Sequence, residues 1–526
     1  RIRELDKLNV RAILFEDGQY ESVRVILEQL IREMHPNEFQ TLTHKASALS
    51  ATAYFNPYVY DSGLTPLFGR SDELDELTRF VTSTHDDFRW WALTGPGGSG
   101  KSRLAFELQN MIDEMPKWHA HKLTSDDYKD LQAYFSKLPS TNMLVIADYV
   151  QAHARELGER MQSLVECSPT SRIRLLLVER EGTSLGNSET QSSWQSQLFE
   201  NVHHVDKVMA ACWDKHFLTL QPLQPNDLLS IIDSFAEALI RRGIAKRQAP
   251  TEEERQRLIE RLNTIDEGLC RPLYALFITG ALMDNSDPSH WDKEKVLDYI
   301  TRRETERIDA RIRHVEGKRT QDRSALRSVL HLYRLATVFQ GGEFELIRTL
   351  CTDEWSKLER AATSIGLDGT EELLDHIGLT KNGTVKPMEP DLMGEYFVFD
   401  WLCKTKPEKR DAFIARAWTQ EISTVIFFDR LFTDYAHLLN EEPNRWLWFL
   451  PPSDSDSTLV LPFLAWIRAT LLTNMSAICS DSKTCTEIVG RIEALLADFP
   501  GDREVALELA KGLFNLSCKQ DADAAA

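Results

Sequence analysis

Residues 95–102 form a glycine-rich loop with a lysine near its end. The loop matches the pattern GxxxxGK[ST] completely, and its residues are Gly95, Pro96, Gly97, Gly98, Ser99, Gly100, Lys101 and Ser102. Glycines let the backbone turn so tightly that consecutive N–H groups point at phosphate oxygens. Lys101 is then expected to reach the β and γ phosphates of a nucleotide, and the Ser102 hydroxyl to bind Mg²⁺. The alternative is a chance glycine-rich turn. The match at all four fixed positions of the pattern argues against it.

An acidic residue follows the next strongly apolar run. Asp148 ends the segment Leu144-Val145-Ile146-Ala147-Asp148 and lies 47 positions after Lys101. A phosphate-binding loop needs such an acid at the end of a neighbouring strand to hold the magnesium shell. Many ATP-hydrolysing proteins place a second acid at the following position, which is Tyr149 here, although Glu156 could substitute. This difference predicts slow hydrolysis, suited to a switch rather than a motor.

A sheet is needed to position the loop and the acid, and the sequence predicts one. Short apolar segments alternate with amphipathic helices up to about residue 242, an alternation that is typical of a parallel sheet with crossover helices. Strands are expected at residues 90–93, 143–147, 173–178 and 217–220, and the helices include residues 101–113 and 152–167. The loop then lies between a strand and a helix, whose positive dipole end favours phosphate.

Helices dominate the rest of the chain. Beyond residue 251 the strands are expected to stop, and helical periodicity returns at residues 252–263, 271–283 and 293–312. Residues 324–402 read as a compact helical unit with a turn at 381–383. Because a small hairpin follows the helices, this unit is expected to be a winged helix.

The two ends of the chain are also predicted to be helical. Residues 1–44 read as two helices broken at Asp17-Gly18, and residues 56–66 form the first loop that could separate domains. From Lys404 on the sequence is helical with a break at 451–457, and its end resembles a single tetratricopeptide-type hairpin.

Composition excludes several classes of protein. The 526 residues are too many for one core, and 42% apolar against 27% charged residues is an ordinary globular balance. A net charge of −20 argues against a general nucleic-acid scaffold. No apolar run approaches the roughly 20 residues of a membrane span, so no membrane contact is expected.

The cysteines and the first residue bear on the location of the protein. None of the eight cysteines has CxxC spacing, and they are expected to be reduced thiols of a cytoplasmic protein. Because the chain starts with Arg1 rather than Met, we expect it to begin inside a longer protein.

Taken together, these motifs resemble the STAND class of signal-transducing P-loop ATPases. Its members are AAA+-related switches found in plant disease-resistance proteins, animal NOD-like receptors, and bacterial regulators and antiphage sensors. The resemblance covers residues 67–402, and its local details are similar to a bacterial subgroup. Besides the loop and Asp148 it rests on three segments, which are Phe68-Gly69-Arg70-Ser71-Asp72-Glu73-Leu74, Leu175-Leu176-Leu177-Val178-Glu179-Arg180 and Gly268-Leu269-Cys270-Arg271-Pro272-Leu273-Tyr274.

Roles for further residues follow from the resemblance alone. It implies that Phe68, Gly69 and Arg70 lie against the nucleotide, although Arg70 could also be a solvated arginine. It implies that Arg180 senses the γ-phosphate, for which an ion pair with Glu179 or Glu181 is the alternative. It implies that Pro272 packs on adenine, although it could simply open a helix. Arg103, directly after the loop, is included among the nucleotide-binding candidates.

The expected fold class is an α/β P-loop NTPase core followed by a helical lid, a winged helix and an all-α C-terminal region. The domains are expected at residues 1–60 (helical linker), 61–250 (nucleotide binding), 251–322 (lid), 323–402 (winged helix) and 403–526 (helical sensor or arm).

The function expected from this arrangement is a switch controlled by ATP, ADP and Mg²⁺. It would sense a protein or metabolite trigger at its C-terminal helices, assemble with copies of itself and activate a missing N-terminal effector module, in antiphage defence. Two alternatives stay open. One is a STAND-type transcriptional regulator that responds to a metabolite, and the other is a plain ATP-driven remodelling ATPase.

Overall fold

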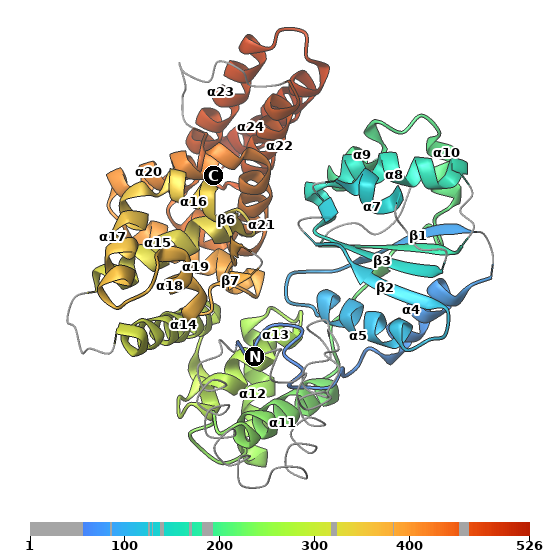
Figure 1. Ribbon diagram of the computed structural model, residues 1–526. Helices are drawn as coiled ribbons and strands as arrows, with labels where there is room; N and C mark the ends of the chain where they lie inside the picture. Colours follow the sequence, from blue (N-terminus) through green and yellow to red (C-terminus); the bar gives the residue numbers. More distant parts are fainter. Residues whose placement is uncertain are drawn as a thin grey trace. The chain divides into compact units, whose positions relative to one another are not determined.

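In the computed structural model, the described residues lie between 56 and 526, with gaps (Figure 1). Outside the described residues lie 1–55, 85–86, 125–126, 129, 137–140, 168–170, 181–192, 317–322, 382, 452–461 and 526. The helices expected within residues 1–44, and Glu181 as a partner of Arg180, therefore lie outside the described residues.

Five parallel strands form the first sheet, in the order β2-β3-β4-β1-β5. The strands are β1 (Phe88–Thr94), β2 (Trp118–Lys122), β3 (Asn142–Asp148), β4 (Ile173–Glu179) and β5 (Leu218–Thr219). The four strands expected from the sequence are confirmed, and β2 was missed. Its Trp-His-Ala-His-Lys sequence lacks the apolar run of β1, β3 and β4 because β2 lies at the edge and is buried only in part.

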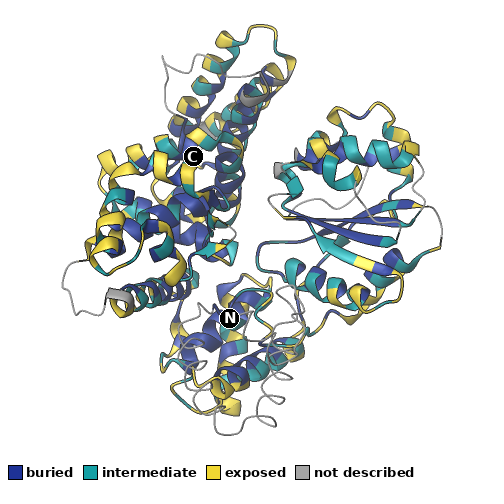
Figure 2. Cartoon of the chain, in the orientation of Figure 1, coloured by how far each residue is buried: buried dark blue, intermediate teal, exposed yellow. Residues whose placement is uncertain are grey.

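Helices cover both faces of this sheet. Figure 1 shows α4 (Ser71–Thr82) and α5 (Lys101–Asp113) on one face and the group from α7 to α10 on the other. This group comprises α7 (Leu131–Ser136), α8 (Ala154–Cys167), α9 (Ser193–Glu200) and α10 (Val205–Ala210), with the 3-10 turn η2 (Val150–Ala152) before α8. Because both faces are covered, the central strands are almost entirely buried (Figure 2).

The next four helices pack on one another. They are α11 (Pro225–Arg241), α12 (Glu252–Ile265), α13 (Pro272–Met283) and α14 (Lys293–Glu316), with η3 (Pro288–His290) between the last two. The apolar helix α13 is buried along almost its whole length because α11, α12 and α14 all pack on it. Helix α11 lies within the range expected for the nucleotide-binding domain, yet it packs on the predicted lid.

A small antiparallel sheet in the order β6-β8-β7 accompanies the helices that follow. The strands are β6 (Gly342–Glu343), β7 (Thr380–Lys381) and β8 (Thr384–Val385), and the helices are α15 (Ser324–Val338), α16 (Phe344–Leu350), α17 (Thr352–Ser364), α18 (Thr370–His376) and α19 (Asp391–Lys404). The β7–β8 hairpin lies where the sequence predicted a small hairpin, and β6 adds a strand that the sequence did not indicate.

Helices alone complete the described chain. They are α20 (Pro407–Ala417), η4 (Trp418–Gln420), α21 (Glu421–Glu441), η5 (Pro443–Phe449), α22 (Pro462–Ile478), α23 (Ser482–Asp498) and α24 (Arg503–Ala525). Helices α22, α23 and α24 pack on one another, and α21 packs on both α19 and α22. The expected fold class, a P-loop core followed by helical regions, is confirmed. No helix among the described residues is long and apolar enough to cross a membrane.

Candidate functional site

A cavity of about 200 Å³ lies at the carboxyl ends of the central strands. Parallel strands end at a common edge, so Asp148 of β3, Glu179 of β4 and the loop after β1 come together there. Twelve of the fourteen site residues predicted from the sequence line this cavity. They are Phe68, Arg70, Gly97, Gly98, Ser99, Gly100, Lys101, Ser102, Arg103, Asp148, Arg180 and Pro272.

The remaining two candidates, Gly69 and Gly95, shape the backbone rather than the cavity wall. Gly69 has φ +64°, and a Cβ there would lie 2.5 Å from the Asp227 carboxyl carbon, so only glycine fits. Gly95 has φ +148° and follows β1 directly. Both allow backbone turns that other residues resist.

The loop before α5 contains left-handed glycines and packs against α13. Gly98 and Gly100 have φ values of +76° and +96°. A Cβ on Gly98 would lie 3.1 Å from the Leu273 side chain of α13, so the loop and that helix touch closely. The Ser99 hydroxyl is buried without a hydrogen-bond partner. An orphaned hydroxyl beside a helix N-terminus fits the binding of an anion such as phosphate.

Lys101 lies folded onto its own loop. Its ammonium group donates to the carbonyl oxygens of Gly95 (2.6 Å) and Pro96 (3.0 Å). Burial, assisted by the nearby Arg180, lowers the pKa of Lys101 to about 8. A cation that is buried against two weak carbonyl acceptors would be stabilised by an anion at this place.

Asp148 joins the loop to a cation that the sequence did not indicate. The Ser102 hydroxyl lies 3.1 Å from Asp148 Oδ2, so the two expected magnesium ligands are adjacent. The ammonium group of Lys122 lies 2.7 Å from the same oxygen. These residues fit a hard divalent cation, because a carboxylate and a hydroxyl are the oxygen ligands that Mg²⁺ prefers.

Within the described residues, the ion-pair partners of Arg180 come from distant helices rather than from its neighbour Glu179. The Glu179 carboxylate accepts from the backbone N–H of Arg180 instead. The guanidinium group lies 2.6 Å from Glu395 Oε1 in α19 and 2.7 Å from Asp434 Oδ2 in α21. Asp391 adds a third carboxylate at 3.5 Å. We call Arg180, Asp391, Glu395 and Asp434 the Arg180 cluster.

Arg70 and Pro272 both contact the loop. Arg70 is buried and donates to the carbonyl oxygen of Gln221 (2.7 Å), to the more distant one of Ser99 (3.5 Å) and to the Glu73 carboxylate (2.8 Å). It is therefore no solvated arginine. Pro272 opens α13 at its first turn, and its Cγ would lie 3.5 Å from a Cβ on Gly100.

Arg271 was missed by sequence reasoning, although it precedes Pro272. Its guanidinium group donates to the Gly97 carbonyl oxygen at 2.9 Å and pairs with the buried Asp266 at 2.6 Å. A charged residue at the start of an apolar helix was the available signal. Gly268, the more distant part of the same motif, has φ +80° and does not line the cavity.

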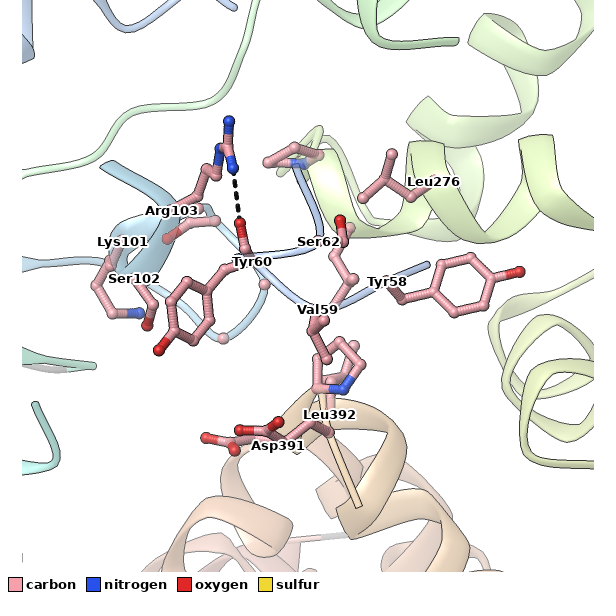
Figure 3. Close-up of a pocket in the computed structure, with 18 of the residues that line it drawn as sticks. Tyr58, Val59, Tyr60, Ser62, Lys101, Ser102, Arg103, Leu276, Asp391 and Leu392 are labelled. Carbon is pink, nitrogen blue, oxygen red and sulfur yellow. Dashed lines mark hydrogen bonds between the residues drawn. The ribbon is translucent and has the colours of Figure 1, made fainter. Parts of the chain in front are cut away.

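Most residues of the segment 57–68 line the cavity. Arg103 fixes this segment, because its guanidinium group donates to the carbonyl oxygens of Tyr60 (2.8 Å) and Thr65 (2.9 Å). Figure 3 shows the Arg103–Tyr60 hydrogen bond beside Lys101 and Ser102, with Asp391 on another side of the cavity. Arg103 thus holds a wall of the cavity, and its binding to a nucleotide stays a prediction.

One other group of potential metal ligands is found among the described residues. His331, Cys351 and Glu354 have ligand atoms within 4.8 Å of one another. The guanidinium group of Arg416 lies 2.9 Å from His331 Nε2 and 3.7 Å from a Glu354 oxygen. Because a cation already satisfies these groups, we do not assign a metal to them.

No protein-family model matches the sequence, and no curated protein matches it. Among solved structures, Cdc6p from Pyrobaculum aerophilum matches with 11% identity and a TM-score of 0.29, covering 65% of this chain and 99% of that chain. The Orc1 protein of Aeropyrum pernix in complex with DNA matches with 13% identity and a TM-score of 0.29, covering 65% and 95%. The RuvB Holliday junction branch migration motor of Thermotoga maritima matches with 15% identity and a TM-score of 0.27, covering 62% and 96%. At such low TM-scores these likenesses say nothing of what this chain binds.

Proposed function

We propose that this chain is a signal-transduction switch controlled by ATP and ADP. In the proposal, residues 95–103 bind the phosphates, Ser102 and Asp148 hold Mg²⁺, and the segment around Phe68 with Pro272 encloses the base. A trigger at the C-terminal helices favours the ATP form, which assembles with copies of itself. The proposed setting is the cytoplasm of a bacterium, where assembly would activate an N-terminal effector against phage.

The Arg180 cluster is the observation that supports a switch. A Cβ on Gly97 would lie 3.3 Å from Arg180 Cζ and 3.3 Å from Asp434 Oδ2, so the cluster lies directly on the phosphate loop. Its acids come from α19 and α21, outside the P-loop core. Arg180 is therefore neutralised by the very parts of the chain that a switch would have to move.

Charge competition then couples nucleotide to conformation. A γ-phosphate at the loop would be an anion within reach of Arg180, and it would compete with Glu395 and Asp434 for the guanidinium group. ADP lacks that phosphate and leaves the cluster intact. A ligand shifts a conformational equilibrium only by its difference in affinity for the two states, and this competition supplies such a difference.

The residues of the site have separate tasks in this proposal. Lys101 would exchange its two carbonyl acceptors for phosphate oxygens. Mg²⁺ would supply positive charge at the phosphates. Arg271 would keep the lid on the loop through the Gly97 carbonyl oxygen. Tyr149, which follows Asp148, donates to Asp391 and is no base for water, so hydrolysis would be slow.

The test measures three properties of the purified chain. It is expected to retain ADP through purification, to turn ATP over slowly, and to change its assembly state with a non-hydrolysable ATP analogue. Sustained rapid turnover without a change of assembly would favour a remodelling ATPase. Failure to bind either nucleotide would contradict the proposal as a whole.

A further inference from the structure

A lysine of the edge strand β2 forms an ion pair with the carboxylate oxygen that the proposed metal site would use. The ammonium group of Lys122 lies 2.7 Å from Asp148 Oδ2, and the Ser102 hydroxyl lies 3.1 Å from that same oxygen. The other oxygen, Oδ1, accepts from the backbone N–H of Tyr149 at 3.1 Å. Both oxygens of a largely buried carboxylate are thus engaged, and one of them is engaged by a full positive charge.

Lys122 is held in place and is not a mobile surface lysine. Its ammonium group lies 3.2 Å from the Tyr60 hydroxyl and 4.5 Å from the centre of the Tyr60 ring. Tyr60 is fixed in turn, because Arg103 binds its carbonyl oxygen at 2.8 Å and the Phe106 ring packs on its edge at 5.9 Å. A cation held by one tyrosine, through its ring and its hydroxyl, and by one carboxylate is fixed between two residues.

The charges around Asp148 explain why a cation is needed there. The Asp148 side chain is only 9% exposed, and a carboxylate that is buried without a positive partner is costly. Lys101 faces the Gly95 and Pro96 carbonyl oxygens rather than Asp148, and Arg180 faces the carboxylates of its own cluster. Among the described side chains, Lys122 is the cation that forms an ion pair with Asp148.

We infer that Lys122 is a positioning residue that competes with Mg²⁺ for the Asp148 carboxylate. The inference rests on the proposed function, because the metal accompanies the bound nucleotide. Lys122 neutralises Asp148 while the metal is absent, so the site stays formed and ADP binding depends little on Mg²⁺. For Mg²⁺ to bind, Lys122 has to release Oδ2, which weakens the affinity of the site for the metal. Tyr60 and Lys122 thereby link metal loading to the segment 57–68, which lines the cavity.

The experiment is a calorimetric titration of Mg²⁺ into ADP-saturated protein, without any activity measurement. Lys122→Met keeps the length of the side chain and removes its charge, and it is expected to lower the apparent Kd for Mg²⁺ about tenfold. Lys122→Arg keeps the charge and is expected to stay within about twofold of wild type. Lys215→Met removes an exposed lysine that does not line the cavity and serves as the control for net charge.

Tyr60→Phe tests the inference with the buried charges left intact, in case Lys122→Met does not fold. It removes one acceptor of Lys122 and so weakens the hold on this competing cation. The Mg²⁺ affinity is expected to rise by about twofold to threefold, with ADP affinity unchanged at saturating Mg²⁺. Thermal unfolding supplies an independent readout, since Mg²⁺ without nucleotide should stabilise Lys122→Met more than wild type.

Two outcomes would overturn the inference while leaving the proposed function in place. The first is an Mg²⁺ affinity that is equal or weaker in Lys122→Met, with ADP still bound. The second is a loss of ATP affinity in that variant with ADP affinity unchanged, which would assign Lys122 to the γ-phosphate. If wild type binds no ADP, the proposed function itself fails, and the inference fails with it.

Discussion

The Arg180 guanidinium group lies 2.7 Å from the Asp434 carboxylate, although 254 positions of sequence separate the two residues. Arg180 follows the last residue of β4 in the P-loop core, and Asp434 belongs to α21 in the C-terminal helical region. Both side chains are largely buried, with 13% and 9% of their surface exposed. A contact of this kind connects the phosphate loop with the part of the chain that is proposed to receive the trigger.

Neutralising Asp434 should favour the ATP form. Asp434→Asn keeps the shape of the side chain and removes one of the charges that compete with a γ-phosphate for Arg180. We expect the affinity for a non-hydrolysable ATP analogue to rise about fivefold to tenfold, with little change for ADP, and assembly to need less trigger. Calorimetry with both nucleotides measures this.

The matched control is Glu441→Gln, which removes an exposed carboxylate from the end of the same helix. It should leave both affinities unchanged. If the affinities for ATP and ADP rose equally in Asp434→Asn, Asp434 would act only through its negative charge near the site and not through competition with the γ-phosphate.

Removing Arg180 should weaken the binding of ATP, which is the opposite of the effect expected for Asp434→Asn. Arg180→Ala eliminates the group that is proposed to contact the γ-phosphate, so ATP should weaken relative to ADP by roughly 1.5–3 kcal/mol, the range for a hydrogen bond to a charged group. ATP-dependent assembly should be lost. Parallel titrations of ADP and the ATP analogue decide the matter, and equal weakening of both would refute the sensing role of Arg180.

Lys101→Ala should abolish nucleotide retention. The variant loses the cation that is proposed to contact the phosphates of both nucleotides, and the affinity for ATP and ADP should fall by at least about a hundredfold. Stability should change little or increase, since burial already lowers the pKa of Lys101 and so makes its charge unfavourable in the empty site. Normal ATP affinity in this variant would contradict the assignment of the phosphate loop.

The sequence predicted the parts of the site that come from one continuous segment. The loop at 95–102, Asp148 and the start of α13 at Pro272 follow from local pattern, because strand ends and helix starts carry their own residue signals. Strand β2 and its Lys122 could not be predicted, since an edge strand that is buried only in part has no apolar run. The partners of Arg180 could not be predicted either, because Glu395 and Asp434 are acids of ordinary helices until the fold brings them together.

The last prediction concerns pH and the buried acid of the Arg180 cluster. Burial, together with the neighbouring carboxylates of Asp434 and Asp391, raises the pKa of Glu395 from 4.5 to about 8, despite the opposing effect of Arg180. Between pH 5 and pH 8 the folded chain therefore keeps a proton on Glu395 that the unfolded chain has released. The stability that this proton contributes is fully present below pH 4.5 and is lost as pH rises through 8.

Glu395→Gln has no such proton, and its amide oxygen can still accept from Arg180. We expect the variant to gain stability relative to wild type by about 2 kcal/mol between pH 5 and pH 8.5, a figure below the full shift because Glu395 titrates in contact with other charged groups of the cluster. Chemical denaturation across this pH range measures it, with exposed Glu408→Gln as the control. Parallel stability curves for Glu395→Gln and wild type would show that Glu395 is ionised throughout, and that Arg180 is held by three full charges rather than two.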